Sequence, residues 1–250
     1  METITISKKD FIEIRYTGYA NSEIFDSNIE EDIKKLNPQF KPQKTIIAVG
    51  EEMVVSGLDN AFPGKEIGKT YEIILSPKES FGERKRALIK TIPLKAFTEK
   101  NVSPKPGMVL TLDNMMARII TVSGARVITD FNNPLAGKEI RYKFTIIRKV
   151  EDEKEKAEAL FEVFFKFIPE YEIKKPATRN GLLDAQDAKH LDIKEKITLK
   201  GPKPLEYFVN HFSPKFKELM GKELGFEEKK PEEKLENKRP ENTLDNTPIK

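Results

Sequence analysis

The sequence contains no cysteine among its 250 residues, which excludes disulfide bonds, thiolate catalysis and the usual zinc sites. It has two histidines, His190 and His211, far apart along the chain, and the C-terminal end is rich in Glu, Lys, Pro and Asn instead of His. The sequence therefore predicts no metal site. The folded state has to be stabilised by packing.

A charge of one sign is also lacking, because 44 basic and 41 acidic side chains are interspersed and leave a net charge of +3. Such a balance produces no long-range field toward nucleic acid, so charge argues against a dedicated nucleic-acid binder. The basic triplet Arg84-Lys85-Arg86 leaves an RNA-associated factor open as a third hypothesis, against the simpler interpretation of a solvated face. No Gly-rich nucleotide loop is present, since Gly57, Gly64 and Gly68 are explained by turns and a helix end.

No apolar stretch approaches the length that spans a bilayer, and residues 1–10 alternate polar and apolar side chains. We therefore expect a cytoplasmic protein without a membrane partner. Hydrophobic residues make up 38% and charged residues 34% of the chain, which is enough for modest cores beneath a strongly solvated surface. A length of 250 residues favours two or three modules.

Alternation of apolar and polar residues predicts an antiparallel sheet with one wet face. Its four predicted strands are 11–17, 45–49, 71–75 and 140–146. A short helix over 54–62, stopped by Pro63-Gly64, is expected to lie across the sheet. The fold class is therefore α+β, with a curved antiparallel half-barrel around one short helix.

Residues 84–134 have a different pattern and are predicted to form an inserted small β domain. The segment begins with a polar stretch containing several prolines, followed by three short strands at 109–112, 118–122 and 126–129. The last two strands are joined by Ser123-Gly124, which indicates a tight hairpin. Because strands of the main sheet precede and follow it, the segment is interpreted as an insertion.

A third module, of α+β type, is predicted over residues 151–226. After a charged run, apolar residues recur at helical spacing from Ala157 to Ile168. Two further helices are expected at 204–211 and 214–224, with short strands near Leu191 and Ile197. Residues 227–250 contain too little apolar surface to offset the entropy of ordering, so a disordered tail is predicted.

Five segments, taken in order, resemble the FKBP family, most closely its SlyD-like and archaeal long members. They are Ile14 to Gly18 (IRYTG), Ile24 to Ser27 (IFDS), Val54 to Gly68 (VVSGLDNAFPGKEIG), Ser76-Pro77 with Ser80-Phe81-Gly82, and Leu135 to Phe144 (LAGKEIRYKF). The resemblance covers about residues 10–150. It implies a peptidyl-prolyl cis-trans isomerase domain at 1–83 and 135–150, interrupted by an insert-in-flap domain at 84–134, with no cofactor.

Apolar and aromatic residues from several of these segments are expected to converge on a concave pocket, a typical ligand site; taken singly, each is better explained as ordinary core. The resemblance implies that they line a prolyl site. Its catalytic residues would be Tyr16, Phe25, Asp26, Val55 and Phe81, and its substrate-binding residues Val54, Leu58 and Tyr142, with Phe144 as the register alternative to Tyr142.

Three of these positions carry a further implication from the family. Leu58 occupies a floor position that many members fill with Trp, and SlyD-like proteins also place Leu there. Phe81 stands where Tyr is usual, so a hydroxyl that commonly donates to a bound carbonyl is absent. Asp26 would orient pocket hydroxyls, whereas on its own an Asp-Ser pair also suits a turn.

The resemblance implies unfolded or partly folded chains with X-Pro bonds as partners, held by the insert near the pocket. Apolar side chains of the insert would either supply that surface or fill the insert's own core; they are Val109, Leu110, Met115, Met116, Ile119 and Ile120. The alternative function is a client-binding holdase with a weak isomerase site. Archaeal long members also suggest homodimerisation through the C-terminal domain.

Overall fold

The computed structural model describes residues 5–174 and 196–229 of the chain, which divides into two compact units, Met1–Val163 and Phe164–Lys250. The division falls inside helix α4 (Glu153–Phe165), beyond the predicted boundary at residue 151. Most of α4, up to Val163, belongs to the first unit, and in its first turn Glu155 forms ion pairs with Lys44 and Arg148, at 2.5 and 2.6 Å.

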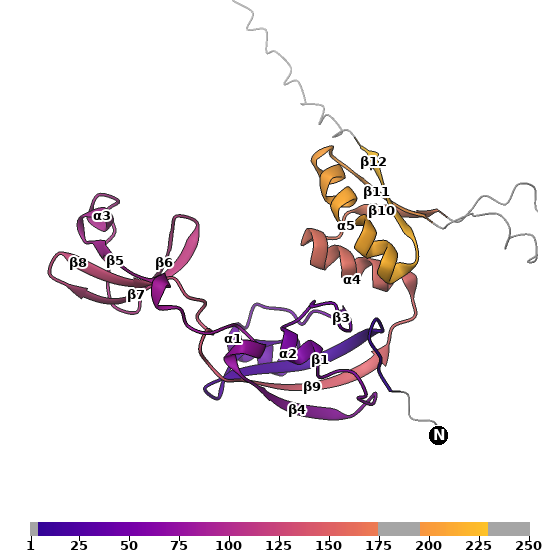
Figure 1. Ribbon diagram of the computed structural model, residues 1–250, viewed down its shortest axis with the longest axis horizontal. Coiled ribbons are helices and arrows are strands. Elements are labelled where there is room, and N and C mark those ends of the chain that lie inside the picture. Colours follow the sequence, from indigo (N-terminus) through magenta and orange to yellow (C-terminus); the bar gives the residue numbers. More distant parts are fainter. Residues whose placement is uncertain (1–4, 175–195, 230–250) are drawn as a thin grey trace, which may run out of the picture. The chain divides into compact units, whose positions relative to one another are not determined.

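The first unit is built on a five-stranded antiparallel sheet (Figure 1). Strand β1 is its centre, pairing along one side with β9 and along the other with β3 at its start and β2 at its end. β9 pairs in turn with β4. The strands are β1 (Phe11–Ala20), β2 (Glu23–Ser27), β3 (Thr45–Ala48), β4 (Thr70–Leu75) and β9 (Ile140–Lys149). All four predicted strands are present. The fifth strand, β2, contains Phe25 and Asp26 and was not predicted.

The helices of this unit are short. Helix α1 (Glu30–Leu36) was not predicted, and α2 (Ser56–Asp59) occupies only the middle of the predicted helix 54–62. The chain leaves α2 through turns that end at Pro63 and Gly64, where a positive φ of 77° suits glycine. One 3₁₀ turn, η1 (Pro77–Glu79), follows β4.

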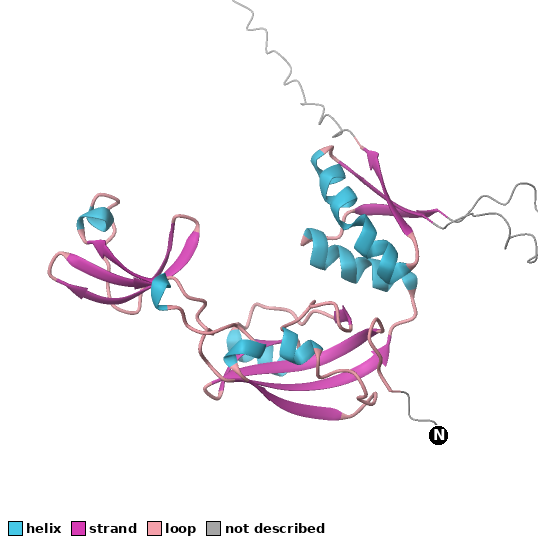
Figure 2. Cartoon of the chain, in the orientation of Figure 1, coloured by secondary structure: helices cyan, strands magenta, loops and turns pink. Residues whose placement is uncertain are grey.

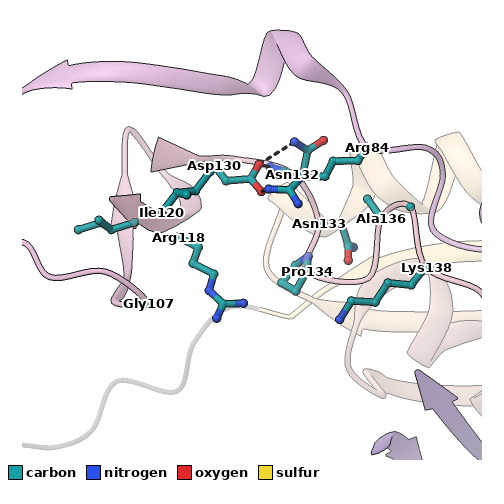
Figure 3. A pocket seen from close by; sticks show the side chains of 12 residues that line it. Arg84, Gly107, Arg118, Ile120, Asp130, Asn132, Asn133, Pro134, Ala136 and Lys138 are labelled. Atoms are coloured by element: carbon teal, nitrogen blue, oxygen red, sulfur yellow. Dashed lines mark hydrogen bonds and ion pairs between the residues drawn. The ribbon is translucent and has the colours of Figure 1, made fainter. Parts of the chain in front are cut away.

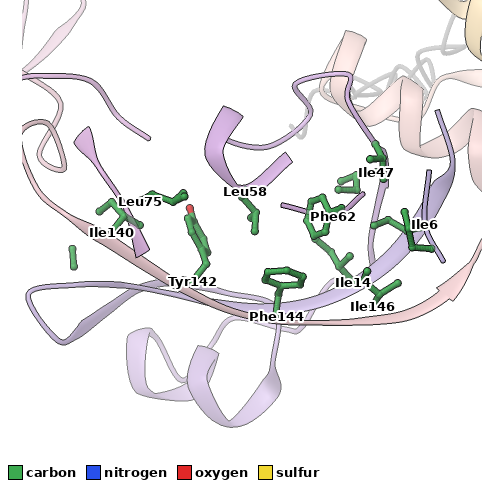
Figure 4. Close-up of a cluster of buried hydrophobic side chains, with 13 residues drawn as sticks. Ile6, Ile14, Ile47, Leu58, Phe62, Leu75, Ile140, Tyr142, Phe144 and Ile146 are labelled. Carbon is green, nitrogen blue, oxygen red and sulfur yellow. The ribbon is translucent and has the colours of Figure 1, made fainter. Parts of the chain in front are cut away.

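The core lies between α2 and one face of the sheet (Figure 4). Alternate residues of β1 and β9 point to this face and pair across the strands, Ile14 with Ile146 and Tyr16 with Phe144. Phe62 packs edge-on against Phe144 with ring centroids 5.0 Å apart. Figure 4 shows Tyr142 and Phe144 extending from β9 toward Leu58 of α2.

The inserted segment forms its own four-stranded sheet in the order β5-β8-β7-β6. The strands are β5 (Ile89–Pro93), β6 (Val109–Leu112), β7 (Met115–Ser123) and β8 (Arg126–Asp130), preceded by η2 (Arg86–Leu88) and accompanied by helix α3 (Lys95–Thr98), both visible in Figure 2. The predicted hairpin joins β7 to β8. The buried core of the insert consists of Phe97, Ile119 and Val127 with a few partly buried neighbours.

The second unit has a three-stranded sheet, β10 (Glu170–Lys174), β11 (Lys196–Gly201) and β12 (Glu223–Glu228). The prediction of two helices here is wrong: one helix, α5 (Pro204–Met220), continues through Pro214. Pro214 removes one backbone hydrogen bond from the helix. The helix nevertheless continues, and apolar side chains are buried both before and after the proline, at Val209 and Phe216.

Two other expectations concern the edges of this unit. Strand β12 extends to Glu228, two residues into the predicted tail. The rest of the tail from residue 230, and the strand expected near Leu191, lie outside the described residues. Within the described ranges, every helix is too short or too polar to cross a membrane.

Candidate functional site

Aromatic side chains gather where β1, β2 and β9 meet the loop after η1. The Phe25 ring stands edge-on to Phe81 and to Tyr142, with centroids 5.6 and 5.9 Å apart, and Tyr142 lies 6.2 Å from Tyr16. Edge-to-face packing at these distances is favourable beyond simple burial. The structure thus brings together four aromatic residues that the sequence scatters over 127 positions.

The cluster has one polar edge, formed by Tyr16 and Asp26. The Tyr16 hydroxyl donates a hydrogen bond of 2.9 Å to Asp26 Oδ2. Burial, reinforced by the negative charge of Asp26, raises the pKa of both Tyr16 and Tyr142 above the ordinary tyrosine value. Both phenols therefore remain protonated near neutral pH. Asp26 lies in strand β2 and accepts the hydroxyl of Tyr16, and its role in the site stays a prediction.

Gly18 explains how the rings fit against the sheet. It pairs with Tyr142 across β1 and β9, and a Cβ atom added here would lie 2.7 Å from the Phe25 ring and 2.9 Å from the Tyr142 ring. Such contacts are too short for carbon atoms, so only glycine leaves room for both rings.

The loop after β4 places Phe81. Ser76 and Glu79 form a capping box at η1, with the Ser76 backbone N–H donating to Glu79 Oε2 at 2.9 Å. The Gly82 N–H donates back to the Pro77 carbonyl at 2.7 Å. The loop is fastened to α2, because the Ser56 hydroxyl donates to the Glu79 carbonyl at 3.2 Å. Local hydrogen bonds therefore fix Phe81 beside Phe25.

The start of α2 offers free backbone donors. Val55 is the N-cap residue, and across the described parts of the chain its N–H has no hydrogen-bond partner within the protein. The approach to Val55 is fixed by Asp59, whose buried carboxylate accepts the Gly50 N–H at 2.7 Å and the Glu52 N–H at 2.8 Å. Val54 and Val55 themselves are half-buried against the core.

The remaining predicted site residues lie deeper. Leu58 and Phe144 are fully buried, and Tyr142 retains only 4% of its exposure. Phe144 packs on Phe62 and Tyr71, so of the two register alternatives it is Tyr142 that contacts Phe25. All nine predicted residues except Asp26 belong to this one core and its partly buried border.

A groove of about 530 Å³ opens beside Tyr16, Phe25 and Asp26. Its other wall comes from α1 and the segment that follows, including Ile33, Leu36, Gln39 and Phe40. Phe40 is 63% exposed there. These lining residues were missed from sequence, although Ile29, Ile33 and Leu36 show the i, i+4, i+7 spacing of an amphipathic helix.

No group of three or more His, Asp or Glu side chains that could hold a metal ion occurs in the described part of the chain. What the site presents is aromatic surface, a tyrosine–aspartate pair and an unpaired backbone N–H. These features suit the binding of a polypeptide carbonyl beside an apolar ring.

Comparison with known proteins agrees with this geometry. The family model for FKBP-type peptidyl-prolyl cis-trans isomerase matches residues 2–99, and the model described as FKBP26, IF domain, matches residues 90–135. The second match falls on the inserted sheet and extends one residue past its predicted end.

Among curated proteins, the short-type peptidyl-prolyl cis-trans isomerase of Methanocaldococcus jannaschii is 32% identical over 151 residues, which cover 59% of this chain and 93% of that protein. The FKBP-type peptidyl-prolyl cis-trans isomerase SlyD of Helicobacter pylori is 28% identical over 156 residues, or 60% of this chain and 77% of SlyD. The chain therefore belongs to the family of FKBP-type peptidyl-prolyl cis-trans isomerases.

Proposed function

We propose that this protein accelerates proline-limited folding by isomerising X-Pro bonds at the aromatic cluster of the first unit. The observation that carries the proposal is the pairing of a nearly dry apolar floor, formed by Tyr142 and Leu58, with the unpaired Val55 N–H at its edge. In this assignment Tyr16, Phe25, Asp26 and Phe81 surround the twisted amide. Val54 and Phe144 support the substrate side.

The chemistry needs no bond to be cleaved. Rotation about an X-Pro bond has to break amide resonance against a barrier of about 18–20 kcal/mol. A site that binds the twisted amide better than either planar isomer lowers this barrier, and each ~1.4 kcal/mol of preference is about tenfold in rate. Because the twisted amide is less dipolar, an aromatic pocket with little water penalises it less than the planar forms.

Two polar groups would orient a bound peptide in the pocket. The Val55 N–H is free to donate a hydrogen bond to a substrate carbonyl. The Tyr16 hydroxyl is held by Asp26 at 2.9 Å and stays protonated because its pKa is raised. Asp26 is exposed and borders the groove, so it faces a bound chain. Proton transfer plays no part.

The test compares Phe25→Ala and Asp26→Asn with Ile74→Ala, a matched control at an exposed position on the outer face of β4. We expect the two site variants to lose isomerisation of a proline tetrapeptide by roughly tenfold or more, and the control to keep it. Proline-limited refolding of a model protein should fall in parallel. Unchanged rates in both site variants would exclude this pocket as the isomerase site.

The insert is assigned a second role, the holding of unfolded chains near the pocket. Five of its large apolar side chains are exposed: Met108, Val109, Met115, Met116 and Ile120. Leu110 and Ile119 belong to the insert's own core. Methionine is unbranched and polarisable, and it adapts to varied partners. A holdase with a weak isomerase site remains the alternative; it predicts that Phe25→Ala leaves aggregation suppression intact and that refolding gains nothing from the intact pocket.

Homodimerisation is proposed for the second unit. Ring contacts there run without a break from Phe167 through Phe165, Phe212, His211 and Tyr207 to Phe208. Tyr207 is 74% exposed and Phe208 and Phe167 about half exposed, which is a large apolar surface for a free monomer. Light scattering on Tyr207→Ser/Phe208→Ser against wild type tests this proposal, since a dimer through this surface should dissociate.

A further inference from the structure

A second cavity, of about 480 Å³, lies at the base of the insert and is lined by basic side chains (Figure 3). One wall comes from the insert sheet and contributes Arg118, Ile120 and Asp130. The other is the segment that leads into β9 and contributes Pro134 and Lys138. The cavity shares no lining residue with the groove beside Phe25.

The charges of this cavity do not balance. Its carboxylate, Asp130, is already engaged: Oδ2 accepts Arg84 Nη2 at 2.5 Å, and Oδ1 accepts the backbone and side-chain N–H groups of Asn132 at 2.9 and 2.6 Å. Burial opposes ionisation of Asp130, but these bonds outweigh it and keep its pKa below the usual range. The negative charge of Asp130 is therefore neutralised by Arg84.

Arg118 and Lys138 remain without a counter-ion. Neither side chain forms an ion pair or side-chain hydrogen bond within residues 5–174 and 196–229. Arg118 pairs in register with Asp130 across β7 and β8, yet Figure 3 shows its guanidinium directed away from that carboxylate, toward the side where the Lys138 ammonium ends. Two cations on facing walls of one cavity attract an anion.

The cavity lies on the route between the two proposed binding surfaces. On the insert, Arg118 lies two residues from the exposed Met116 and two from the exposed Ile120 along β7, and it pairs with Val109 of β6. It therefore lies within the open apolar face. On the isomerase side, the Gly137 N–H donates to the Gly82 carbonyl at 2.8 Å. Gly82 follows Phe81 directly, so the Lys138 wall adjoins the proposed prolyl site.

We propose that this cavity binds the carboxylate of an acidic side chain on a polypeptide client, held by Arg118 and Lys138, while a proline of the same chain occupies the aromatic site. The proposal rests on the proposed isomerase function. It names a substrate class: extended segments with Asp or Glu several residues from proline. An extended chain advances by about 3.3 Å per residue, so only certain spacings connect the two sites.

A carboxylate fits better than a nucleic-acid or phosphate ligand. Among the described residues that line the cavity, Arg118 and Lys138 are the two cations without a counter-ion, and the Arg84–Asp130 pair adds no net positive charge, so a singly charged anion suits the cavity better than a multiply charged one. Nucleic-acid binding requires a row of cations along a backbone. The apolar Ile120 and Pro134 beside the cations suit the methylene groups of a Glu side chain.

The experiment uses the full chain and labelled ten-residue peptides with one X-Pro bond. A single Glu is placed at each distance from proline, and each peptide has a Gln twin. Anisotropy at low salt should give a Glu-over-Gln preference of about three- to tenfold at one or two spacings, reduced by added salt. Arg118→Gln/Lys138→Gln should abolish the preference, and Arg118→Glu/Lys138→Glu should transfer it to Lys peptides.

The matched control is Lys100→Gln/Arg126→Gln, which removes the same charge from exposed positions of the insert outside the cavity. It should retain the preference. Equal loss in both double variants, or no preference at any spacing, overturns the proposal. Displacement of the Glu peptide by inorganic phosphate far more readily than by acetate would also overturn it, in favour of a phosphate site.

Failure of the proposed function is read separately. An uncharged proline tetrapeptide cannot reach the cavity, so its isomerisation rate should be the same in wild type, the Arg118/Lys138 variant and the control. If wild type fails to isomerise the tetrapeptide, the proposed function is wrong while the binding preference still reports on the cavity.

Discussion

The two sheets of the first unit differ in how much of their apolar surface is covered by the rest of the protein. The sheet centred on β1 and β9 covers its apolar face with α2 and buries a continuous core from Ile6 to Ile146. The insert sheet covers one face with a small core, whose buried cluster is Phe97, Ile119 and Val127, and on the other face it exposes Met116, which is 62% accessible. A covered face gives a pocket of defined shape, whereas an open face adapts to varied chains.

The largest effect is expected where the covered face is most densely packed. Phe144→Ala should lower the free energy of unfolding by about 3–5 kcal/mol, because Phe144 is fully buried against Phe62 and Tyr71. Urea unfolding measures this loss. Ile74→Ala, at an exposed position on the same sheet, should change stability by less than about 0.5 kcal/mol. A loss below about 1 kcal/mol in Phe144→Ala would mean that the face is not packed as described.

The second effect separates the two faces of the insert. Ile119 is fully buried and its neighbour Ile120 is exposed on the other face. Ile119→Ala should cost about 2–4 kcal/mol and open the insert, seen as faster hydrogen exchange in β5 to β8 with unchanged exchange in β1 and β9. Tetrapeptide isomerisation should persist.

Ile120→Ala is the matched variant, with the same chemical change one residue away. It should leave hydrogen exchange of the insert intact and weaken aggregation suppression. If Ile119→Ala also accelerated exchange in β1 and β9, the two sheets would be one cooperative unit and the contrast between them would fail.

The same contrast explains which parts were predictable from sequence. Apolar and polar residues alternate along strands β4 and β9 and along the first half of β1, so the predicted positions hold within a few residues, although β1 is largely buried on both faces. The family prediction, carried by five ordered segments, is confirmed by the comparisons. Strand β2 was missed because its two apolar residues, Ile24 and Phe25, are adjacent in sequence, and its burial alternates only over Phe25 to Ser27.

The site was predicted as a list of residues but not as a shape. Its aromatic members were named, and the structure brings them together; their individual roles stay predictions. The Tyr16–Asp26 hydrogen bond and the clearance at Gly18 depend on strand register, which sequence alone does not fix. The groove wall from Ile33 to Phe40 was missed because its helical spacing extends over only a short helix, which is followed by a proline-flanked loop.

Helix α5 shows the opposite error. Pro214 was interpreted as a break between two helices, by a rule that holds for isolated helices. In the folded unit, apolar side chains on both sides of Pro214 are buried. Tertiary packing therefore outweighs the local cost of one lost hydrogen bond.

A third, smaller effect tests how tightly the covered face shapes the pocket. In Gly18→Ala the new methyl group would lie 2.7 Å from the Phe25 ring. Because the ring is half-buried and can move, we expect a stability loss of about 1–3 kcal/mol together with a clear fall in tetrapeptide isomerisation. The rate is measured beside Gly64→Ala, where the added carbon meets no neighbour but φ is 77°. The Gly64→Ala control should lose some stability through backbone strain and keep its rate of tetrapeptide isomerisation. A normal rate in Gly18→Ala would show that the pocket does not depend on glycine at this position.

The smallest effect concerns the outer surface, where charges instead of apolar contacts attach the first turn of α4. Glu155 binds Lys44 and Arg148, and Glu13 binds the same two cations at 3.5 and 2.8 Å. Hydrogen bonds from Lys44 and then Arg148 lower the pKa of Glu155, so its contribution is present above the unfolded-state pKa and disappears as pH falls through the lower folded-state value. Glu155→Gln should therefore cost about 0.5–1 kcal/mol at pH 7 and low salt, less at high salt, and nothing at a pH where wild-type Glu155 is protonated. Thermal unfolding at two pH values measures the difference. An equal loss at both would show that α4 is held by packing, as the covered sheet is, and not by charge.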